Sequence, residues 1–301
     1  LSSAIFFFFK KKNQRKELFS KKNEFVKIRE YLIKNYNKVK INSQKIIRGD
    51  VFVALRGKNS HGNEYISEAL NNGAKYIVTD KLLKNDLIRK NILIVDDTLS
   101  FLLKIATYKR DLFNGKIIGI TGSVGKTSVK ENLKYFLSSF SKVSASIKSY
   151  NNLLGVLISL ININLLSDFA IFEIGTNNFS EIKELTSIVK PSQIIITNIF
   201  PTHLDKLINT RNVAIEKSDI FNRKYNPNAE LIILPNNNVD EEFLIKLAKN
   251  NFVTNIFTFG KNHKSNLKIS KIKKIDRNFT ELSLDYKNEI IDFTINNNQL
   301  H

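Results

Sequence analysis

Short, almost continuously apolar runs alternate with helical stretches along this 301-residue chain from residue 117 onward. The apolar runs are Ile117–Ile120, Ala170–Ile174, Ile194–Thr197, Leu231–Leu234 and Ile256–Phe259. The helical stretches between them are Val129–Phe140, Ser180–Val189, Val213–Phe221 and Glu241–Lys249. Continuously apolar strands are buried on both faces, and strands that alternate with helices form parallel sheets covered on both sides. The pattern therefore predicts an α/β domain with a mostly parallel sheet.

A smaller α/β unit is expected before this domain, and short antiparallel strands after it. The first part should contain helices at Glu24–Asn35 and Glu64–Asn72, and strands at Val51–Leu55, Tyr76–Val78 and Ile92–Val95. A connecting helix at Thr98–Phe113 should then open the central domain. The last part should contain strands at Leu267–Ile272, Thr280–Tyr286 and Ile290–Ile295, with a turn at Lys287-Asn288. We expect a basic extension over residues 1–38, an N-terminal domain over 39–96 and a central domain over 97–301.

The composition narrows the functional classes. The chain carries 47 basic and 28 acidic residues, a net charge of +19. Such a charge attracts polyanions. The basic residues are nevertheless scattered, and the aromatic-basic signatures of RNA-binding modules are missing. A lysine-rich background explains the charge equally well, and we expect no nucleic-acid partner. The absence of cysteine excludes disulfides and cysteine-bound zinc, and is compatible with a cytoplasmic location.

The two ends of the chain carry separate expectations. Residues 1–9 are apolar and are followed by three lysines, but a membrane-spanning helix needs about 20 apolar residues. We expect a frayed end, with the tail of a membrane anchor as the alternative. The sequence contains no methionine and stops at His301 without a closing element. We therefore expect the central domain to be incomplete at its C-terminal side.

A glycine-rich loop lies between the first apolar run and the next helical stretch. It reads Gly119-Ile-Thr-Gly-Ser-Val-Gly-Lys-Thr-Ser128. The strict phosphate-loop motif requires a glycine where this chain has Ile120. The rest of the motif, Gly122-x-x-Gly125-Lys126-Thr127, is present. Its backbone N–H groups can surround phosphate oxygens, Lys126 adds a positive charge, and the Thr127 hydroxyl can hold Mg²⁺. The alternative is an ordinary glycine turn before a helix capped by Thr127 or Ser128.

Polar side chains follow the next two strands. Ligands of parallel α/β sheets bind beyond the carboxyl ends of the strands. Glu173 stands at such an end and can place a carboxylate beside Mg²⁺. His203 follows a later strand, in a loop fixed by Pro201, and can bind metal or phosphate. The alternatives are a glutamate that faces water and an incidental loop histidine.

Lys217 and the asparagine pair at 151 and 152 have ordinary explanations when they are taken alone. Lys217 lies on the predicted helix after the His203 loop and would be a solvated helix lysine. Asn151 and Asn152 form a polar loop before an apolar helix and would simply mark where that helix begins.

Five motifs in this order resemble the Mur ligases, ATP-dependent amide-forming enzymes of peptidoglycan synthesis. The matching residues are Ile120–Ser128, Asn151-Asn152-x-x-Gly155, Glu173-x-Gly175, Thr197-Asn198-Ile-x-Pro201-x-His203-Leu204 and Ala214-x-x-Lys217. The shortened glycine loop of that family accounts for Ile120. Within the family, the chain is most similar to the members that add D-alanyl-D-alanine to UDP-N-acetylmuramoyl-tripeptide, because the loop has the serine-valine form and residues 42–62 match their N-terminal domain.

The resemblance implies a role for each matched residue. Lys126, Glu173, His203 and Lys217 would be catalytic, with Lys217 carbamylated. Mg²⁺ would be held by Thr127, Glu173 and His203. ATP would contact the loop and the asparagine pair, as follows: Gly122, Ser123, Val124, Gly125, Lys126, Thr127, Ser128, Asn151 and Asn152. The reaction would proceed through an acyl phosphate in a monomeric enzyme.

The resemblance also implies a UDP contact at Ser43 and Gln44. The family usually has Asp-Ser-Arg where this chain has Asn42-Ser43-Gln44, and Asp-Gly-His where it has His61-Gly62-Asn63. The family's C-terminal domain is not represented, so we expect these 301 residues to be inactive alone. Two alternatives stay open: a ligase of the same family with another amine, and a basic nucleotide- or polyanion-binding module without ligase activity.

Overall fold

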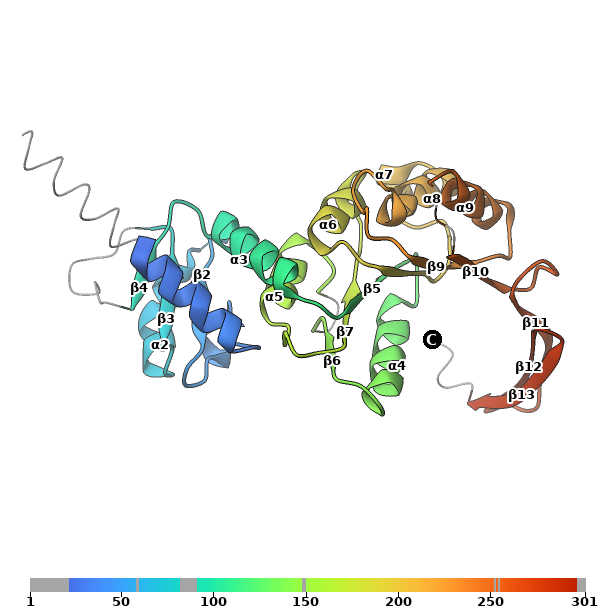
Figure 1. The fold of residues 1–301 in the computed structure, drawn as a ribbon, viewed down its shortest axis with the longest axis horizontal. Coiled ribbons are helices and arrows are strands. Elements are labelled where there is room, and N and C mark those ends of the chain that lie inside the picture. Colours follow the sequence, from blue (N-terminus) through green and yellow to red (C-terminus); the bar gives the residue numbers. More distant parts are fainter. Residues whose placement is uncertain are drawn as a thin grey trace, which may run out of the picture. The chain divides into compact units, whose positions relative to one another are not determined.

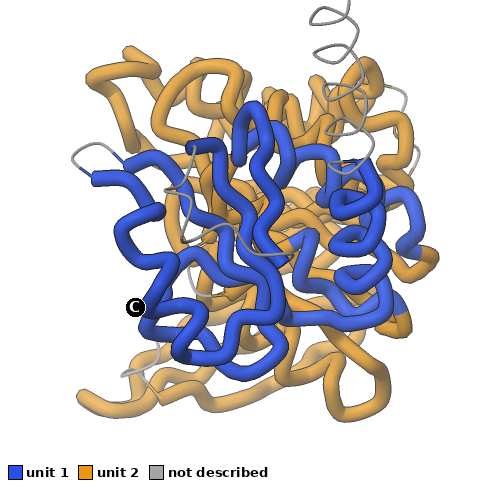
Figure 2. Tube along the Cα trace, turned by 90° about the vertical axis from the view of Figure 1, so that its left-hand side faces the viewer, with its two compact units in different colours: residues 1–113, 160–165 blue, residues 114–159, 166–301 orange. Residues whose placement is uncertain are grey.

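The computed structural model describes residues 22–57, 60–81, 91–147, 150–251, 253 and 255–296 (Figure 1). The expectations for residues 1–12 and for His301 lie outside the described residues. The chain divides into two compact units, residues 1–113 with 160–165 and residues 114–159 with 166–301 (Figure 2). Helix α3 (Thr98–Leu112), which the sequence placed in the central domain, falls within the first unit.

The first unit contains a parallel four-stranded sheet in the order β1-β2-β3-β4. Its strands are β1 (Val39–Lys40), β2 (Val51–Ala54), β3 (Tyr76–Thr79) and β4 (Ile92–Ile94). Its helical segments besides α3 are residues 22–34, η1 (Ser43–Lys45), η2 (Gly62–Tyr65) and α2 (Ile66–Asn71). Every residue of β2 is buried, which confirms the sequence expectation of a doubly covered strand. The two-residue strand β1 was not predicted.

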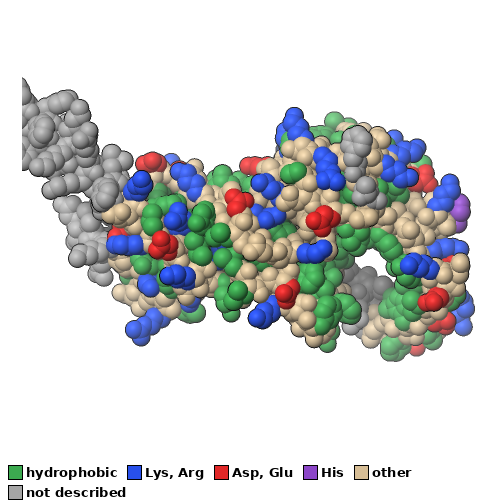
Figure 3. All heavy atoms as spheres, viewed as in Figure 1, with side chains coloured by type: hydrophobic (Ala, Val, Ile, Leu, Met, Phe, Trp, Pro, Cys, Tyr) green, Lys and Arg blue, Asp and Glu red, His purple; other side chains and the backbone are tan. Residues whose placement is uncertain are grey.

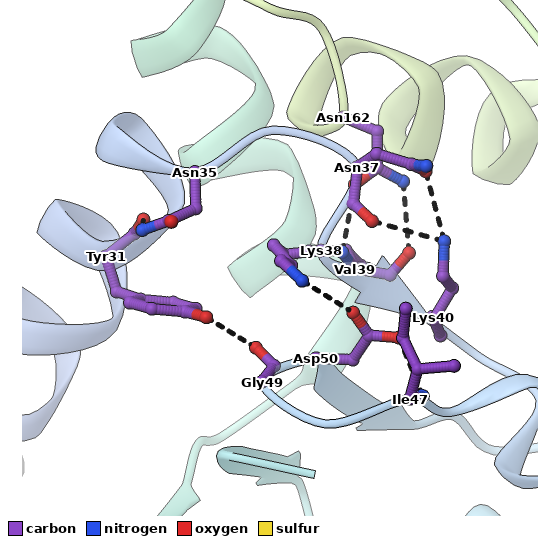
Figure 4. Close-up of polar contacts among 10 residues, drawn as sticks. All are labelled: Tyr31, Asn35, Asn37, Lys38, Val39, Lys40, Ile47, Gly49, Asp50 and Asn162. Atoms are coloured by element: carbon purple, nitrogen blue, oxygen red, sulfur yellow. Dashed lines mark hydrogen bonds and ion pairs between the residues drawn. The ribbon is translucent and has the colours of Figure 1, made fainter. Parts of the chain in front are cut away.

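Residues 160–165 belong to the first unit although the rest of their neighbours in sequence do not. Asn162 explains this, because its side chain pairs with the edge strand β1 as a further strand would. Its Oδ1 accepts a hydrogen bond from the Val39 N–H at 2.9 Å, and its Nδ2 donates to the Val39 carbonyl at 3.0 Å. Nearby, the Tyr31 hydroxyl donates to the Gly49 carbonyl, and Lys38 lies 3.6 Å from buried Asp50 (Figure 4).

The second unit is built on a nine-stranded sheet in the order β13-β12-β11-β10-β9-β8-β5-β7-β6, counted over the described residues. Its strands are β5 (Lys116–Thr121), β6 (Val143–Ala145), β7 (Phe169–Glu173), β8 (Gln193–Ile196), β9 (Leu231–Pro235), β10 (Asn255–Gly260), β11 (Leu267–Lys274), β12 (Phe279–Tyr286) and β13 (Glu289–Asn296). The five apolar runs predicted from the sequence are β5, β7, β8, β9 and β10, and all of them pair in parallel. The prediction of a mostly parallel sheet is therefore confirmed.

Helices cover both faces of this sheet, as the sequence predicted. They are α4 (Lys126–Ser138), α5 (Leu153–Ile161), α6 (Glu181–Val189), α7 (Leu204–Leu207), α8 (Thr210–Ser218), η4 (Asp219–Phe221) and α9 (Val239–Asn250). Helix α4 lies on one side, and α6, α8 and α9 lie on the other (Figure 1). Strand β5 is flanked by β7 and β8, so the loops that follow these three strands meet at one edge of the sheet.

The antiparallel strands β11 to β13 extend the same sheet instead of forming a separate one. Phe259 and Gly260 of β10 pair in parallel with Leu267 and Lys268 of β11, and the pairing becomes antiparallel from β11 onward. The predicted turn at Lys287-Asn288 is confirmed, with φ angles of 55° and 67° that suit a tight hairpin turn.

Candidate functional site

The glycine loop joins β5 to α4 at the middle of the large sheet. Gly122 has a φ of 143°, and a Cβ atom there would overlap the Thr197 hydroxyl, so only glycine fits. Gly125 has a φ of 81° and stands immediately before α4. Lys126, Thr127 and Ser128 form the first turn of that helix. The loop therefore ends at a helix N-terminus, whose free N–H groups favour an anion.

The Lys126 side chain folds back over the loop. Its ammonium group donates to the Gly122 carbonyl at 2.7 Å and to the Ser123 carbonyl at 3.2 Å. Burial lowers the pKa of Lys126, and the charge of Glu173 acts against that shift. The positive charge thus lies at the opening of the loop, where a phosphate would bind.

Two N–H groups of the loop are directed away from a phosphate position. The Ser123 N–H donates to the Asn198 carbonyl at 3.2 Å, and the Val124 N–H donates to Asn198 Oδ1 at 3.0 Å. The prediction from the sequence was that every N–H group from Gly122 to Thr127 would contact phosphate. In the structure, the N–H groups at the start of α4 are the ones placed at a helix N-terminus.

Glu173 lies at the end of β7 with only 1% of its surface exposed. Its Oε2 accepts a hydrogen bond of 2.8 Å from the Thr127 hydroxyl, and its Oε1 accepts one of 2.9 Å from Asn151 Nδ2. The buried ammonium group of Lys130 lies 3.9 Å from Oε2. The alternative of a water-facing glutamate is therefore wrong.

Asn151 and Asn152 act on different groups. The Asn151 carbonyl accepts a hydrogen bond from the Gly175 N–H at 3.0 Å, and its side chain reaches Glu173. Asn152 Oδ1 accepts from the Gly155 N–H at 2.9 Å at the start of α5. Asn152 therefore caps a helix, as its ordinary interpretation predicted, whereas Asn151 joins the carboxylate cluster.

A pocket of about 430 Å³ opens beside this cluster. Its lining includes Lys126, both asparagines, Gly175, Thr176 and His203. His203 is exposed and has a φ of 54°, a backbone conformation that non-glycine residues adopt mainly where the surrounding structure enforces it. The structure thus brings Lys126, at the start of α4, and His203, in the segment after β8, to one pocket although they are far apart in sequence.

Lys217 is buried on α8, with 2% of its surface exposed. Burial, and then the positive charge of Lys126, lowers the pKa of Lys217 to about 8, while Glu216 opposes the shift. Glu216 accepts hydrogen bonds from the Ser180 and Ile182 N–H groups at the start of α6. The alternative of a solvated helix lysine at position 217 is wrong.

Ser43 and Gln44 lie in the first unit, in η1. Ser43 is buried, and its hydroxyl donates to Glu68 at 2.5 Å. Gln44 is exposed. In the altered His61-Gly62-Asn63 stretch, His61 Nε2 lies 2.8 Å from Asp80 Oδ1, and His61 Nδ1 accepts from the Asn63 N–H.

Two buried charged residues were missed by sequence reasoning. Lys130 donates to the Ser146 carbonyl at 3.0 Å beside Glu173. It stands four residues after Lys126, on the same face of α4, and this spacing could have revealed it. Glu241 accepts from Asn237 at 2.7 Å and from the Ile199 N–H at 3.3 Å, so it braces the loop after β8. No local sequence pattern indicates that role.

Three further observations bear on function. Among the described residues, no group of three or more His, Cys, Asp or Glu side chains is arranged to hold a metal ion. Within the same ranges, no helix is both long and apolar enough to cross a membrane. Lysine and arginine side chains are spread over the face shown in Figure 3 and do not gather into one basic patch there.

Comparisons with known proteins agree with the motif order. The profile of the Mur ligase middle domain matches residues 120–297, and that of the Mur ligase family catalytic domain matches residues 35–110. The UDP-N-acetylmuramoyl-tripeptide–D-alanyl-D-alanine ligase of Rickettsia prowazekii is 38% identical over 264 residues, which are 87% of this chain and 57% of that protein. The chain thus spans little more than half the length of this curated relative.

Solved structures show the same fold. MurF from Acinetobacter baumannii superposes with a TM-score of 0.72 at 24% identity, over 85% of this chain and 55% of that one. The MurF ligase from Thermotoga maritima in complex with ADP gives a TM-score of 0.70 at 25% identity, over 89% and 61%. Because a family profile matches more than half of its residues, the chain belongs to the Mur ligase family.

Proposed function

We propose that the protein to which this chain belongs is an ATP-dependent ligase that adds D-alanyl-D-alanine to UDP-N-acetylmuramoyl-tripeptide in peptidoglycan synthesis. The relatives with the same printed name support the substrates, and the ADP complex of a structural neighbour supports the nucleotide. The cluster of Lys126, Thr127 and Glu173 at the N-terminus of α4 is the structural observation that carries the proposal.

The α4 N-terminus would hold the β- and γ-phosphates of ATP. The free N–H groups in the first turn of α4, from Lys126 to Ser128, would face the anion, and Lys126 would leave the Gly122 and Ser123 carbonyls to pair with a phosphate. The exchange replaces neutral acceptors by a charged one, which gives a stronger hydrogen bond.

Thr127 and Glu173 fit a magnesium ion. Mg²⁺ needs only one or two protein oxygens, because water and phosphate oxygens complete its octahedral shell. The Thr127 hydroxyl and a Glu173 oxygen are 2.8 Å apart, and both are oxygen donors of the kind this ion prefers. When bound, Mg²⁺ would neutralise phosphate charge as the terminal phosphoryl group is transferred. Lys130 and Asn151 would keep the Glu173 carboxylate oriented toward Thr127.

The chemistry proposed has two steps. The terminal carboxylate of the tripeptide attacks the γ-phosphorus of ATP and displaces ADP, which gives an acyl phosphate. The amine of D-alanyl-D-alanine then attacks the acyl carbon and expels inorganic phosphate. The first step is needed because a free carboxylate has no good leaving group. The chain's contribution is to position the reactants and to stabilise the transferred charge.

His203 and Lys217 would act on the acceptor side of the pocket. We propose that Lys217 is carbamylated, which turns a buried amine into an anionic oxygen donor. A pKa of about 8 leaves a substantial neutral fraction near physiological pH, and the neutral amine is the form that reacts with CO₂. The carbamate and His203 would then orient a second cation. Ser43 and Gln44 would contact the UDP group, with exposed Gln44 the more accessible of the two.

The cytoplasm as location, a monomeric state and the inactivity of these 301 residues alone belong to the same proposal. The chain covers only 57% of the length of the Rickettsia protein. Ligation is therefore to be measured with the whole protein, and nucleotide binding with this chain.

Phosphate release tests the ligase against the polyanion-binding alternative. The whole protein should release phosphate from ATP only when muramoyl tripeptide and D-alanyl-D-alanine are both present. Release that responds to nucleic acid and ignores the tripeptide would support the binding module instead. Ligation of an amine other than D-alanyl-D-alanine would leave the family assignment unchanged and would alter the proposed substrate.

A further inference from the structure

The phosphate loop is hydrogen-bonded to the segment that carries His203. This segment, residues 197–203, follows β8 and is called here the histidine segment. Contacts between it and the loop are made at Thr197, Asn198, Phe200 and Thr202. Two loops that are far apart in sequence are therefore joined at several successive residues.

The Ser123 hydroxyl is the centre of these contacts. It donates to the Phe200 carbonyl at 3.0 Å and accepts from the Phe200 N–H at 2.9 Å. It also lies 3.2 Å from the Thr202 hydroxyl, which donates to it. One donor and two acceptors are all that a serine hydroxyl offers, so its capacity is fully used.

Val124 is held in a similar way from the other side. Asn198 accepts from its N–H at 3.0 Å and donates to its carbonyl at 3.1 Å, and the Thr197 hydroxyl donates to the same carbonyl at 2.6 Å. These bonds fix the backbone of the loop. The Ser123 bonds, by contrast, fix the part of the histidine segment that leads directly to His203.

The position of His203 depends on that last stretch. Thr202 immediately precedes His203. The positive φ of 54° at His203 requires the neighbouring backbone to be held. The His203 side chain lines the same pocket as Lys126, and Lys126 stands only three residues after Ser123 in the sequence. A movement of the loop at Ser123 would therefore be passed to His203 through Phe200 and Thr202.

We propose that Ser123 is a positioning residue that couples nucleotide binding at the phosphate loop to the placement of His203. The inference rests on the proposed function, since it takes the loop to be the nucleotide site. The ATP contact expected at Ser123 is not part of this proposal, because Phe200 and Thr202 already occupy the Ser123 hydroxyl. Ser123 sets the distance between the nucleotide and the group that His203 holds on the acceptor side of the pocket.

A structural brace alone would predict a different result. Removal of a brace lowers stability and weakens nucleotide binding together. Removal of a coupling group leaves nucleotide affinity nearly unchanged and changes only how His203 responds to the nucleotide. The two roles are separated by measuring affinity and the His203 environment in the same sample.

The test uses the 301-residue chain with ADP and Mg²⁺ as the probe. Calorimetry gives the affinity for ADP, and imidazole NMR, assigned with a His203→Gln variant, gives the shift of His203 on binding. Ser123→Ala should keep the affinity within about threefold and reduce the His203 shift to less than about half. Thr202→Val removes the hydroxyl that can donate to the Ser123 hydroxyl or to the Phe200 carbonyl, keeps the side-chain shape, leaves both bonds between Ser123 and Phe200 in place, and should reduce the shift less. Ser139→Ala is the matched control, because the Ser139 hydroxyl bonds the Phe136 carbonyl at the far end of α4.

The outcomes distinguish this inference from the proposed function. If wild-type chain binds ADP and the His203 shift is the same in Ser123→Ala, Ser123 does not couple the two groups, and the inference alone fails. If ADP affinity falls in proportion to the shift, Ser123 is only a brace. If wild-type chain does not bind ADP, the nucleotide site itself is wrong, and the proposed function fails with the inference.

Discussion

The Thr127 hydroxyl donates a 2.8 Å hydrogen bond to Glu173, which joins the first turn of α4 to the end of β7 across 46 positions of sequence. The contact places an alcohol and a carboxylate beside the ammonium group of Lys126. Their arrangement follows from sheet order, because β5 and β7 are neighbours and their carboxyl ends share one edge. The predictions below concern the groups that surround this pair.

Lys126→Ala should lower tripeptide-dependent ATP turnover by the whole protein by about 10²- to 10³-fold, the effect of losing one donor to a transition-state charge. Turnover and the thermal midpoint are both measured. Lys134→Ala is the control, since Lys134 is exposed on the same helix. Turnover unchanged in Lys126→Ala would remove the loop from the mechanism.

Glu173→Gln should raise the Mg²⁺ concentration needed for half-maximal turnover by about tenfold or more. The amide keeps the shape of the side chain but supplies a neutral oxygen, which a hard cation binds less well than a carboxylate. A magnesium titration at saturating ATP measures this. An unchanged magnesium requirement would place the metal elsewhere.

Lys130→Met should destabilise the second unit by about 3 kcal/mol, because it removes the ammonium group that lies 3.9 Å from the buried Glu173 carboxylate. Denaturant unfolding of the 301-residue chain gives this value. Lys134→Met serves as the comparison and should change stability by less than about 0.5 kcal/mol. Equal effects of the two substitutions would show that the Lys130–Glu173 contact contributes nothing.

Lys217 should acquire a carbamate in bicarbonate buffer, with occupancy rising between about pH 7 and pH 9 as the amine loses its proton. Isotope-labelled bicarbonate and NMR of the carbamate carbon report the modification. Lys109 is an internal control. Burial lowers its pKa to about 8 as well, yet its ammonium group donates to the Leu32 and Ile161 carbonyls and should stay unmodified.

Arginine variants of Lys217 and of the control Lys109 show which of the two lysines carries the carbamate. A carbamate signal that survives in Lys217→Arg and disappears in Lys109→Arg would contradict the assignment.

The lowered pKa of Lys217 also affects stability. Between about pH 8 and 10.5 the unfolded chain keeps a proton that the folded chain has released, so this group's contribution to the unfolding free energy rises with pH across that range.

Most of the second unit was predictable from the sequence because its strands are buried on both faces. Ile118 and Ile171, for example, belong to one apolar cluster, and such strands leave an unbroken apolar signal. The short edge strand β1 left none, because two residues carry no periodicity. The pairing of β11 with β10 involves two residue pairs and depends on tertiary contact.

The site was predictable where a residue type and its place beyond a strand indicated the same role. Lys126 follows the glycine loop after β5, and Glu173 ends β7. Contacts between loops were not predictable. Nothing local shows that the Ser123 hydroxyl bonds Phe200, or that the Thr197 hydroxyl excludes a Cβ at position 122. Likewise, no local pattern shows that the Ser43 hydroxyl bonds Glu68, which lies 25 positions later in the sequence.

The central claim is that the chain's phosphate loop and carboxylate cluster serve the activation of a carboxylate by ATP. Transfer of labelled oxygen tests it most directly. The whole protein is supplied with ATP, D-alanyl-D-alanine and muramoyl tripeptide whose terminal carboxylate carries heavy oxygen, and the released phosphate is analysed by mass spectrometry. We predict one heavy oxygen in each phosphate released, together with the pentapeptide product. Phosphate that carries only light oxygen would contradict the account, because no acyl phosphate would then have formed.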